Sequence, residues 1–418
     1  MTITPRNKNR IVFVIGLLSC IQVRVVGTFS IAEVVALLAM PFVGLSCLRN
    51  KQIATFMAML GVWLLGVVIS DILNETPQVD AIKGAFNVIL FIAIIPFIYW
   101  SLKDNIYRIL YYAAGYGISG VLQWRFFIST GDNEYYAQVW LSYCLIGLIC
   151  YIGYYLYSKG HKIAAYIVME GFAFWTLFNE SRHLFLMISL GIVILLIIGN
   201  VKENNWQIKQ QKFLRNIIPL SIVLGIAFLG VTKTYSHLAS EGYLGERAQH
   251  KYEVQHSTRM GLASGRQDFI LAIHTIAANP IWGYGSYAKD KTGLNYQLLR
   301  QLESKQTAQI LYSSTYQEML HGHSYILGAW VYSGILGAIF WIYVLGIILK
   351  FARKYLLSYP TLTCYFVISI SLMMWDILFS PFANRLNFAY FIIPMLVTIS
   401  NGGPVYLRNK RTPLNLKS

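Results

Sequence analysis

Two histidines, His321 and His323, lie where a long polar segment of the chain meets an apolar run. Histidine titrates near neutral pH, so an imidazole at such a boundary can take a proton from a hydroxyl group as a general base. Helical geometry predicts that Gly334 lies almost directly beneath His323 after about three turns, with Gly337 close to the same face. Such small residues let a neighbouring helix approach closely. The pattern favours His323 as the base and His321 as a neighbour that tunes it or binds substrate; the alternative is a hydrogen-bonded boundary histidine without chemistry.

Five positively charged side chains are expected on the same membrane face as these histidines: Lys83, Arg125, Arg182, Arg266 and Arg385. Guanidinium groups bind phosphate oxygens bidentately, and a low dielectric strengthens that attraction, so the cluster is suited to a diphosphate. We interpret Arg182 and Arg266 as catalytic groups, and the other three, together with His321, as substrate-binding groups. For each residue alone, a snorkelling side chain or a structural ion pair is an equally good interpretation.

The sequence contains no recognisable motif for binding a metal ion or a nucleotide. It contains neither an Asp-x-Asp pair, which would hold a divalent metal on a sugar nucleotide, nor a Walker A sequence. The cysteines fall within or beside apolar runs without metal-ligand spacing, as small buried hydrophobes do, at positions 20, 47, 144, 150 and 364. We therefore expect no cofactor and no metal, and energy from a gradient or from an activated substrate.

The elements that must position these side chains are apolar runs of about 20 residues, the length that crosses ~30 Å of hydrocarbon. The chain is 56% hydrophobic and only 12% charged, whereas soluble proteins carry about 25% charged residues. We predict an all-α, polytopic membrane protein with about twelve transmembrane helices. The predicted spans are 11–26, 29–48, 53–73, 81–101, 106–129, 135–157, 162–178, 181–199, 214–232, 322–349, 360–379 and 386–401.

The connections between these runs alternate in charge, as the positive-inside rule requires. One set carries most of the lysines and arginines, for example at 202–215 and 350–354. The short loops of the other set, 71–80 and 131–134, are acidic and contain neither. Both termini are therefore predicted to be cytoplasmic. The net charge of +16 reflects this topology, and no nucleic-acid partner is expected because no binding motif accompanies the charge.

Three regions follow from this pattern: an N-terminal transmembrane bundle over 1–232, a polar loop outside the cytoplasm over 233–321, and C-terminal spans with a cytoplasmic tail over 322–418. Within the loop, apolar residues recur at helical spacing from Phe269 to Ala277, a stripe that fits the membrane surface. Asn279 and Pro280 should end that helix, and Gly283 to Gly285 should form a turn. A second helix is predicted from about Leu294 to Leu311.

The spacing of His323, Ser324, Gly334 and Gly337 matches every fixed position of the histidine motif of bacterial O-antigen ligases. Related polysaccharide polymerases carry a similar motif, and the chain resembles this superfamily also in length, span number and the single large loop. One departure is visible. Members often have an asparagine after the histidine and a glutamate in the following turns, whereas here Ser324 follows and no acidic residue precedes Gly334. Which group would support His323 from its own helix therefore stays open.

The arginines that end the stretches 179–182 and 264–266 are similar to the two extracytoplasmic arginines of that superfamily. The resemblance implies a fold of the GT-C type and an enzyme of the bacterial inner membrane with a periplasmic active site. It implies transfer of a glycan from undecaprenyl diphosphate to a sugar hydroxyl, in lipopolysaccharide O-antigen or related surface polysaccharide assembly. Such a donor is already activated, so no metal is required if fixed positive charge stabilises the leaving diphosphate, and direct displacement would invert the anomeric carbon.

The partners follow from the same resemblance: an undecaprenyl-diphosphate-linked glycan as donor, membrane lipids, and an acceptor glycan. The acceptor is a lipid A core sugar for a ligase and a second lipid-linked repeat for a polymerase, and the sequence does not separate the two. A chain-length regulator is a further candidate partner. The rival function is a transporter, such as a flippase for lipid-linked oligosaccharides. Transporters commonly show internal repeats and ionisable groups near mid-membrane; no repeat is evident, and Asp376, near the end of its span, could orient a catalytic group instead.

Overall fold

The chain folds into helices packed along one another, as seen in a computed structural model. The structure describes residues 4–19, 21–24, 28–126, 134–178, 182–199, short pieces between 230 and 252, 267–302, 320, 322, 324–356, 362–380, 382 and 386–401. The helices are α1 (Pro5–Ser19), α2 (Ile31–Cys47), α3 (Lys51–Leu73), α4 (Gln78–Leu102), α5 (Arg108–Phe126), α6 (Glu134–Ser158), α7 (Lys162–Phe178), α8 (Arg182–Gly199), α11 (Gln267–Ala278), α12 (Leu294–Leu302), α14 (Tyr325–Lys354), α15 (Thr363–Phe379) and α16 (Leu386–Asn401).

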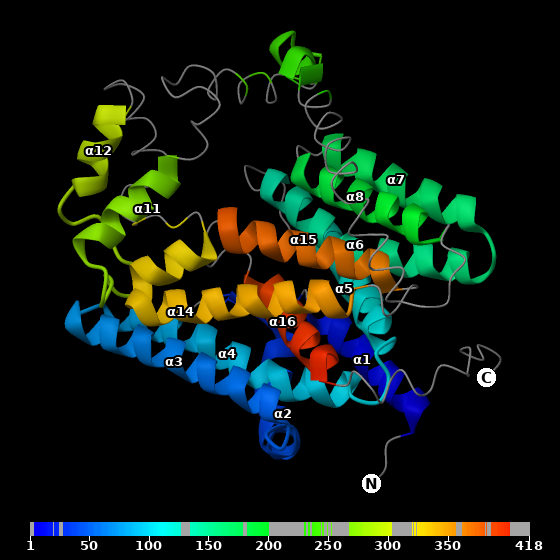
Figure 1. Cartoon of the computed structure of the whole chain (residues 1–418), viewed down its shortest axis with the longest axis horizontal. Coiled ribbons are helices and arrows are strands. Elements are labelled where there is room, and N and C mark those ends of the chain that lie inside the picture. The colour runs from blue at the N-terminus through cyan, green and yellow to red at the C-terminus, as the bar shows by residue number, and fades with distance from the viewer. Residues whose placement is uncertain are drawn as a thin grey trace.

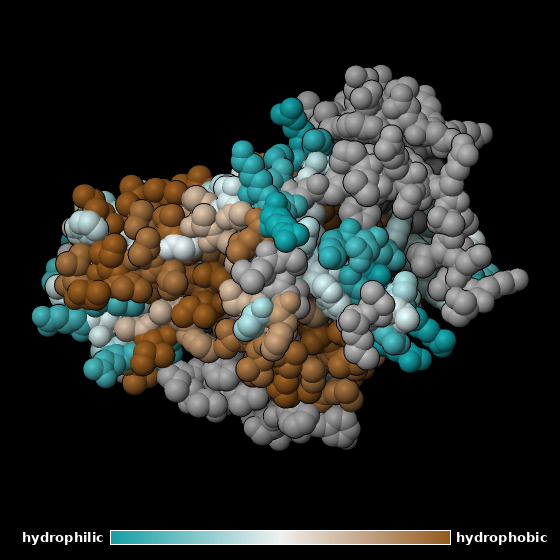
Figure 2. Space-filling model, turned by 90° about the horizontal axis from the view of Figure 1, so that it is seen from below, coloured by the Kyte–Doolittle hydropathy of each residue, from teal (hydrophilic) through white to brown (hydrophobic). Residues whose placement is uncertain are grey.

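Among the described residues, α3, α4 and α14 are long and apolar enough to cross a membrane. Several large apolar side chains on α3 face outward, including Leu65 and Ile72, which is 70% exposed. The space-filling view shows a broad hydrophobic surface over this side of the molecule (Figure 2). An apolar surface of this extent would be unfavourable in water and is typical of a lipid-facing one. The three helices and their exposed faces indicate a protein embedded in a membrane.

A helix lies at each predicted apolar run that the structure describes, although the first run was assigned wrongly in its second half. The predicted span 11–26 corresponds to α1, which ends at Ser19, followed by the strand β1 (Gln22–Arg24). That strand pairs antiparallel with β2 (Thr28–Ser30), so the described chain is helical with one small hairpin. The β-branched residues after position 22 favour extended backbone, and Pro5 suits the first position of a helix that begins earlier than predicted. The predicted span 214–232 lies almost wholly outside the described residues.

The core around the candidate site is aromatic and lies between α3, α4 and α14. The rings of Trp63 and Phe340 stack with centroids 4.9 Å apart, and Trp341 meets the Tyr325 ring edge-on at 4.8 Å. Gly66 lets α14 approach α3 closely, because a Cβ there would lie 2.8 Å from the carbonyl oxygen of Ser333. Figure 1 shows α14 running across the middle of the molecule, with α3 and α4 beneath it.

Helix α14 is broken at Ser333 and Gly334, which corrects the helical geometry predicted for His323. Gly334 has φ 65° and ψ −161°, a conformation that is essentially restricted to glycine. In addition, the helix begins only after Ser324, whose hydroxyl accepts from the N–H of Leu327 as its N-cap. The three regular turns assumed between His323 and Gly334 therefore do not exist. The close approach of a neighbouring helix that was expected at Gly334 and Gly337 is not found there: the backbone of Ile281 and Trp282 lies against Gly334, and Gly337 faces its own helix. The glycine that lets α3 approach α14 is Gly66.

The first helix predicted in the polar segment is present as α11, which ends at Ala278 as Asn279 and Pro280 predicted. Its predicted apolar stripe is divided between two surroundings. Ile276 is buried, with Ala272, against Val331 of α14, which removes that apolar area from water. Ile273 is 49% exposed and Ala277 is exposed as well, so this part of the stripe remains open. The second predicted helix, 294–311, is present as α12 from Leu294 to Leu302, and the remainder of it lies outside the described residues.

Candidate functional site

A turn of the polar segment, residues 283–287, docks on the end of α3. The carboxylate of Asp71 accepts hydrogen bonds from the backbone N–H and from the hydroxyl of Ser286, the latter with 2.9 Å between the oxygens. Ser70 Oγ accepts from the N–H of Gly285 at 2.9 Å. Asp71 and Ser286 are both buried, and hydrogen bonds to an ionised group are among the stronger ones. The turn is therefore fixed to α3 by side chains shielded from bulk water.

Replacing Asp71 with alanine is expected to destabilise this docking by about 2–3 kcal/mol, because two donors of Ser286 would lose a charged acceptor. The melting temperature of the protein in nanodiscs should fall, and a protease should cut the polar segment faster. Asp80→Ala is the matched control, since the half-buried Asp80 makes an ion pair with Lys83 at 3.3 Å that should contribute less than about 1 kcal/mol. Equal stability of the two variants would contradict the anchoring role of Asp71.

Main-chain hydrogen bonds join the same turn to the break in α14. In an unbroken helix the carbonyls before the break would accept from amides one turn further on, so the break leaves them available to the turn. The pairs, as donor N–H to acceptor carbonyl, are Tyr284 to Val331 at 2.8 Å, Gly285 to Tyr332 at 3.1 Å and Ile335 to Ile281 at 3.1 Å. A Cβ on Gly334 would lie 2.1 Å from the carbonyl oxygen of Ile281. The polar segment and the membrane helix are thus joined backbone to backbone.

Tyr284 is a titratable side chain within this turn. Its burial, and then the negative charge of Asp290, raise the pKa of the Tyr284 phenol. Because an ordinary tyrosine already titrates at about 10, this side chain stays protonated at neutral pH. The docking of the turn therefore does not change through Tyr284 in the physiological range.

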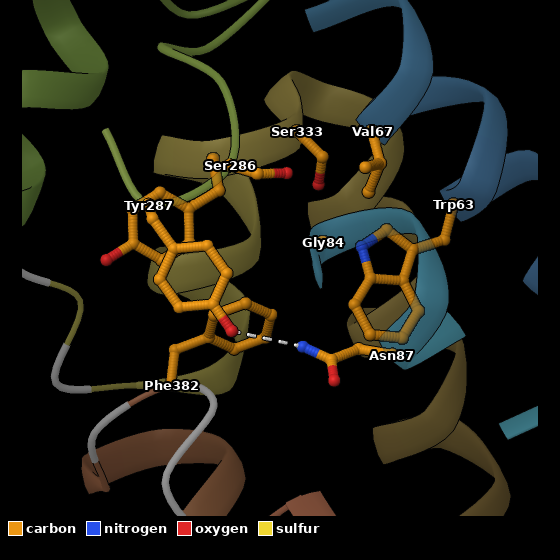
Figure 3. Close-up of a pocket in the computed structure, with 9 residues that line it drawn as sticks. Trp63, Val67, Gly84, Asn87, Ser286, Tyr287, Ser333 and Phe382 are labelled. Atoms are coloured by element: carbon orange, nitrogen blue, oxygen red, sulfur yellow. Dashed lines mark hydrogen bonds between the residues drawn. The ribbon is translucent and has the colours of Figure 1, made fainter. Parts of the chain in front are cut away.

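A pocket opens where α3, α4, the turn and the break in α14 meet (Figure 3). It encloses about 390 Å³ of empty space, including its opening to solvent. Aromatic rings supply much of its wall, and an amide and two serine hydroxyls supply polar groups. The lining residues are Trp63, Val67, Gly84, Asn87, Ser286, Tyr287, Tyr332, Ser333 and Phe382. An apolar wall with a few placed polar groups is typical of a small-molecule or cofactor site.

Lys83 places a positive charge beside this pocket. Its Nζ lies 5.7 Å from the ring centroid of Tyr287, within the range of a cation–π contact. One turn further along α4, Asn87 donates from Nδ2 to the hydroxyl of Tyr287 at 3.4 Å. Tyr287 therefore connects the charged group at the edge of the pocket with the amide inside it.

The segment that carries the two histidines is tied to the walls of the pocket through the residues that alternate with them. His321 and His323 themselves lie outside the described residues. The carbonyl of Leu320 accepts from the hydroxyl of Tyr332, and that of Gly322 accepts from the N–H of Phe382, both at 2.9 Å. The hydroxyl of Ser324 donates to the carbonyl of Ile377 at 2.8 Å. Tyr332 and Phe382 also line the pocket.

Of the residues predicted from the sequence to act at a site, Lys83 is the one whose side chain the structure describes. Arg182 begins α8 and Arg125 lies near the end of α5, but their side chains are outside the described part. Arg266 and Arg385 also fall outside it. Asp376, considered as an orienting group, is buried near the end of α15 and accepts from the hydroxyl of Ser380 through Oδ1.

Sequence reasoning missed the residues that build the pocket and its anchor. Asp71 was counted only as part of an acidic loop that reports topology. Asn87 gave a usable signal, since an amide within an apolar run of a membrane protein points to an internal cavity or a partner group. Trp63 gave none, because a tryptophan in a span is indistinguishable in sequence from a core residue.

Comparison of the chain with family models, curated proteins and solved structures finds no match. The functional argument therefore depends on the site itself.

Proposed function

We propose that this protein is a membrane glycosyltransferase that moves a glycan from undecaprenyl diphosphate to the hydroxyl of an acceptor sugar. The observation that supports this most is the pocket, which is lined by aromatic, amide and hydroxyl groups, lies beside Lys83 and shares Tyr332 and Phe382 with the anchors of residues 320 and 322. Aromatic faces suit the apolar C–H faces of sugars, amides and hydroxyls suit their hydroxyl groups, and a lysine suits a phosphate.

In the proposed reaction the acceptor oxygen attacks the anomeric carbon of the donor. The bond between that carbon and the diphosphate oxygen breaks, and the diphosphate leaves with the electron pair. His323 takes the proton of the acceptor hydroxyl, and direct displacement inverts the anomeric carbon. The donor is already activated, so fixed positive charge on Arg182 and Arg266 would be the main stabilisation of the leaving group, a term that is often the largest in catalysis. Lys83 would help to hold the diphosphate.

The arrangement in the membrane is part of the same proposal. The long polar segment, the pocket and the positive cluster would face the periplasm, with both termini in the cytoplasm and about twelve helices crossing the inner membrane. Arg125, Arg385 and His321 would contact substrate at that face. This orientation places the site on the side where lipid-linked glycans are joined after their translocation.

The direct test is reconstitution of the purified protein in nanodiscs with a lipid-linked repeat as donor. Two acceptors are offered separately: lipid A core, whose glycosylation would identify a ligase, and a second lipid-linked repeat, whose extension would identify a polymerase. A deletion strain separates the two as well, since single-repeat caps on lipid A core persist only when a polymerase is lost. Absence of transfer to either acceptor, with export of the donor across vesicles, would instead identify a transporter.

Lys83→Gln is expected to raise the KM for the donor about tenfold and to change kcat less. The lysine would contact the diphosphate in both the ground state and the transition state, and a charged hydrogen bond contributes about 1.5–3 kcal/mol. Lys83→Arg should retain most of the affinity. Lys103→Gln is the matched control, because Lys103 is exposed at the opposite end of the same helix. A Lys83→Gln enzyme with wild-type KM would exclude a role for Lys83 in donor binding.

A further inference from the structure

The pocket contains a buried hydrogen-bond donor that no protein group satisfies. The indole Nε1 of Trp63 has no hydrogen-bond partner, although the side chain is 2% exposed. Figure 3 shows this nitrogen turned toward the interior of the pocket. A buried N–H without an acceptor costs about 1–3 kcal/mol, so a ligand atom in the pocket that accepts from Nε1 would be stabilising.

The ring of Trp63 is held rigidly, which fixes where that acceptor must be. Phe340 stacks on it at 4.9 Å with an interplanar angle of 14°, and Trp341 and Phe382 meet it edge-on at 5.6 and 6.1 Å. The indole therefore cannot turn its N–H elsewhere without disturbing the core. A donor preorganised in this way favours binding because little freedom is lost when the ligand arrives.

The lining of the pocket decides between the chemical groups that could fill it. None of its lining residues is charged, and a diphosphate in a low dielectric would need compensating charge. A hydrocarbon tail would leave the N–H of Trp63 and the polar groups of Asn87 and Ser333 facing apolar atoms. A neutral sugar has hydroxyl groups that can accept from the N–H groups of Trp63 and Asn87 and donate to the oxygen of Ser333, whose own proton goes to the carbonyl of Ala329. It also offers an apolar ring face to the aromatic wall.

The position of Lys83 beside the pocket indicates which sugar of a glycan would occupy it. Lys83 lies one turn before Asn87 on α4, about 6 Å along the helix, and its ammonium group is beside Tyr287. A ligand with a sugar in the pocket and a phosphate at Lys83 must have the two groups directly bonded. We propose that the pocket is the subsite for the sugar linked directly to the lipid diphosphate, an inference that depends on the proposed function.

The test measures binding rather than turnover. Affinities of wild type and variants in nanodiscs are measured for two probes: undecaprenyl diphosphate alone, and undecaprenyl diphosphate carrying one hexose. The wild type should bind the hexose-bearing probe at least about fivefold more tightly, the equivalent of one added hydrogen bond. Trp63→Phe should remove that preference and leave the affinity for the bare diphosphate unchanged.

Two further variants keep the result interpretable. Trp341→Phe is the matched control: its Nε1 is also buried without a partner, but Trp341 does not line the pocket, so the preference should persist. Asn87→Leu, which preserves the number and branching of the side-chain heavy atoms, should reduce the preference even if Trp63→Phe fails to fold.

The subsite proposal fails if the hexose adds no affinity in the wild type, or if the variants weaken both probes equally, which would place lipid or diphosphate in the pocket. It also fails if Trp63→Phe and Asn87→Leu change neither probe, which would mean that water alone occupies the site. A protein that shows the hexose preference but transfers no glycan would retain the subsite and lose the proposed function. A protein that binds neither probe would lose both.

Discussion

Replacing His323 with alanine is expected to lower the rate of glycan transfer at least about 100-fold, the usual contribution of a positioned general base. The acceptor hydroxyl would have to lose its proton to water, while the binding groups for donor and acceptor remain. The loss should therefore appear in kcat with little change in either KM. Purified protein with lipid-linked donor and acceptor in nanodiscs provides the measurement, and an unchanged melting temperature would show that the fold is intact.

His321→Ala is the matched control for this experiment, since it removes an imidazole only two positions away in the sequence. It is expected to change a KM rather than kcat, because His321 is assigned to substrate binding. Near wild-type turnover in His323→Ala would refute the general-base role. A loss confined to His321→Ala would transfer that role to the other histidine.

Replacing Gly334 with alanine is expected to destabilise the protein by about 2–4 kcal/mol, since a side chain is strained at this φ and ψ. The new Cβ would also meet the carbonyl oxygen of Ile281 at 2.1 Å, and the junction between the turn and α14 could not form as it is. Melting in nanodiscs should occur well below the wild-type temperature, and the polar segment should become sensitive to protease.

Gly346→Ala lies on the same helix and tests the opposite case. A Cβ at Gly346 meets nothing within 4 Å, and alanine is favoured over glycine inside a helix by about 1 kcal/mol. Its stability should therefore equal or exceed that of the wild type. If the two alanine variants melted together, the strain assigned to Gly334 would be wrong.

Most of the described helices were predictable from the sequence because each lies on an apolar run, a local property, although only α3, α4 and α14 among them are long and apolar enough to cross a membrane. The end of the first run was missed because extended and helical segments of the same apolar composition are hard to tell apart. The break in α14 was missed for a different reason. Gly334 has the spacing of a packing residue, and its conformation is selected by the backbone of residues 281–285, which are distant in sequence.

In the candidate site, too, residues with a local signal in the sequence were predicted, and residues that depend on distant partners were not. Lys83 was found because a positive charge on the acidic side of the topology is conspicuous along the sequence. The pair of Asp71 and Ser286 was not found, because the two residues lie 215 positions apart in the sequence. Neither residue has a distinctive sequence context of its own. Trp63 is recognised as a candidate ligand-binding residue only because its indole nitrogen has no hydrogen-bond partner in the folded pocket. The sequence does not contain this information.

The backbone junction between the turn and the break in α14 has a consequence for how this chain can vary. Residues 281–285 form backbone hydrogen bonds with α14, and residues 285 and 286 form hydrogen bonds with Ser70 and Asp71 of α3. These two sets of contacts fix the length of the segment 281–287. One inserted residue would shift the pairings by a position and leave buried main-chain groups unbonded, at a cost of about 1–3 kcal/mol each. Insertions and deletions that leave this junction intact must therefore fall on either side of residues 281–287.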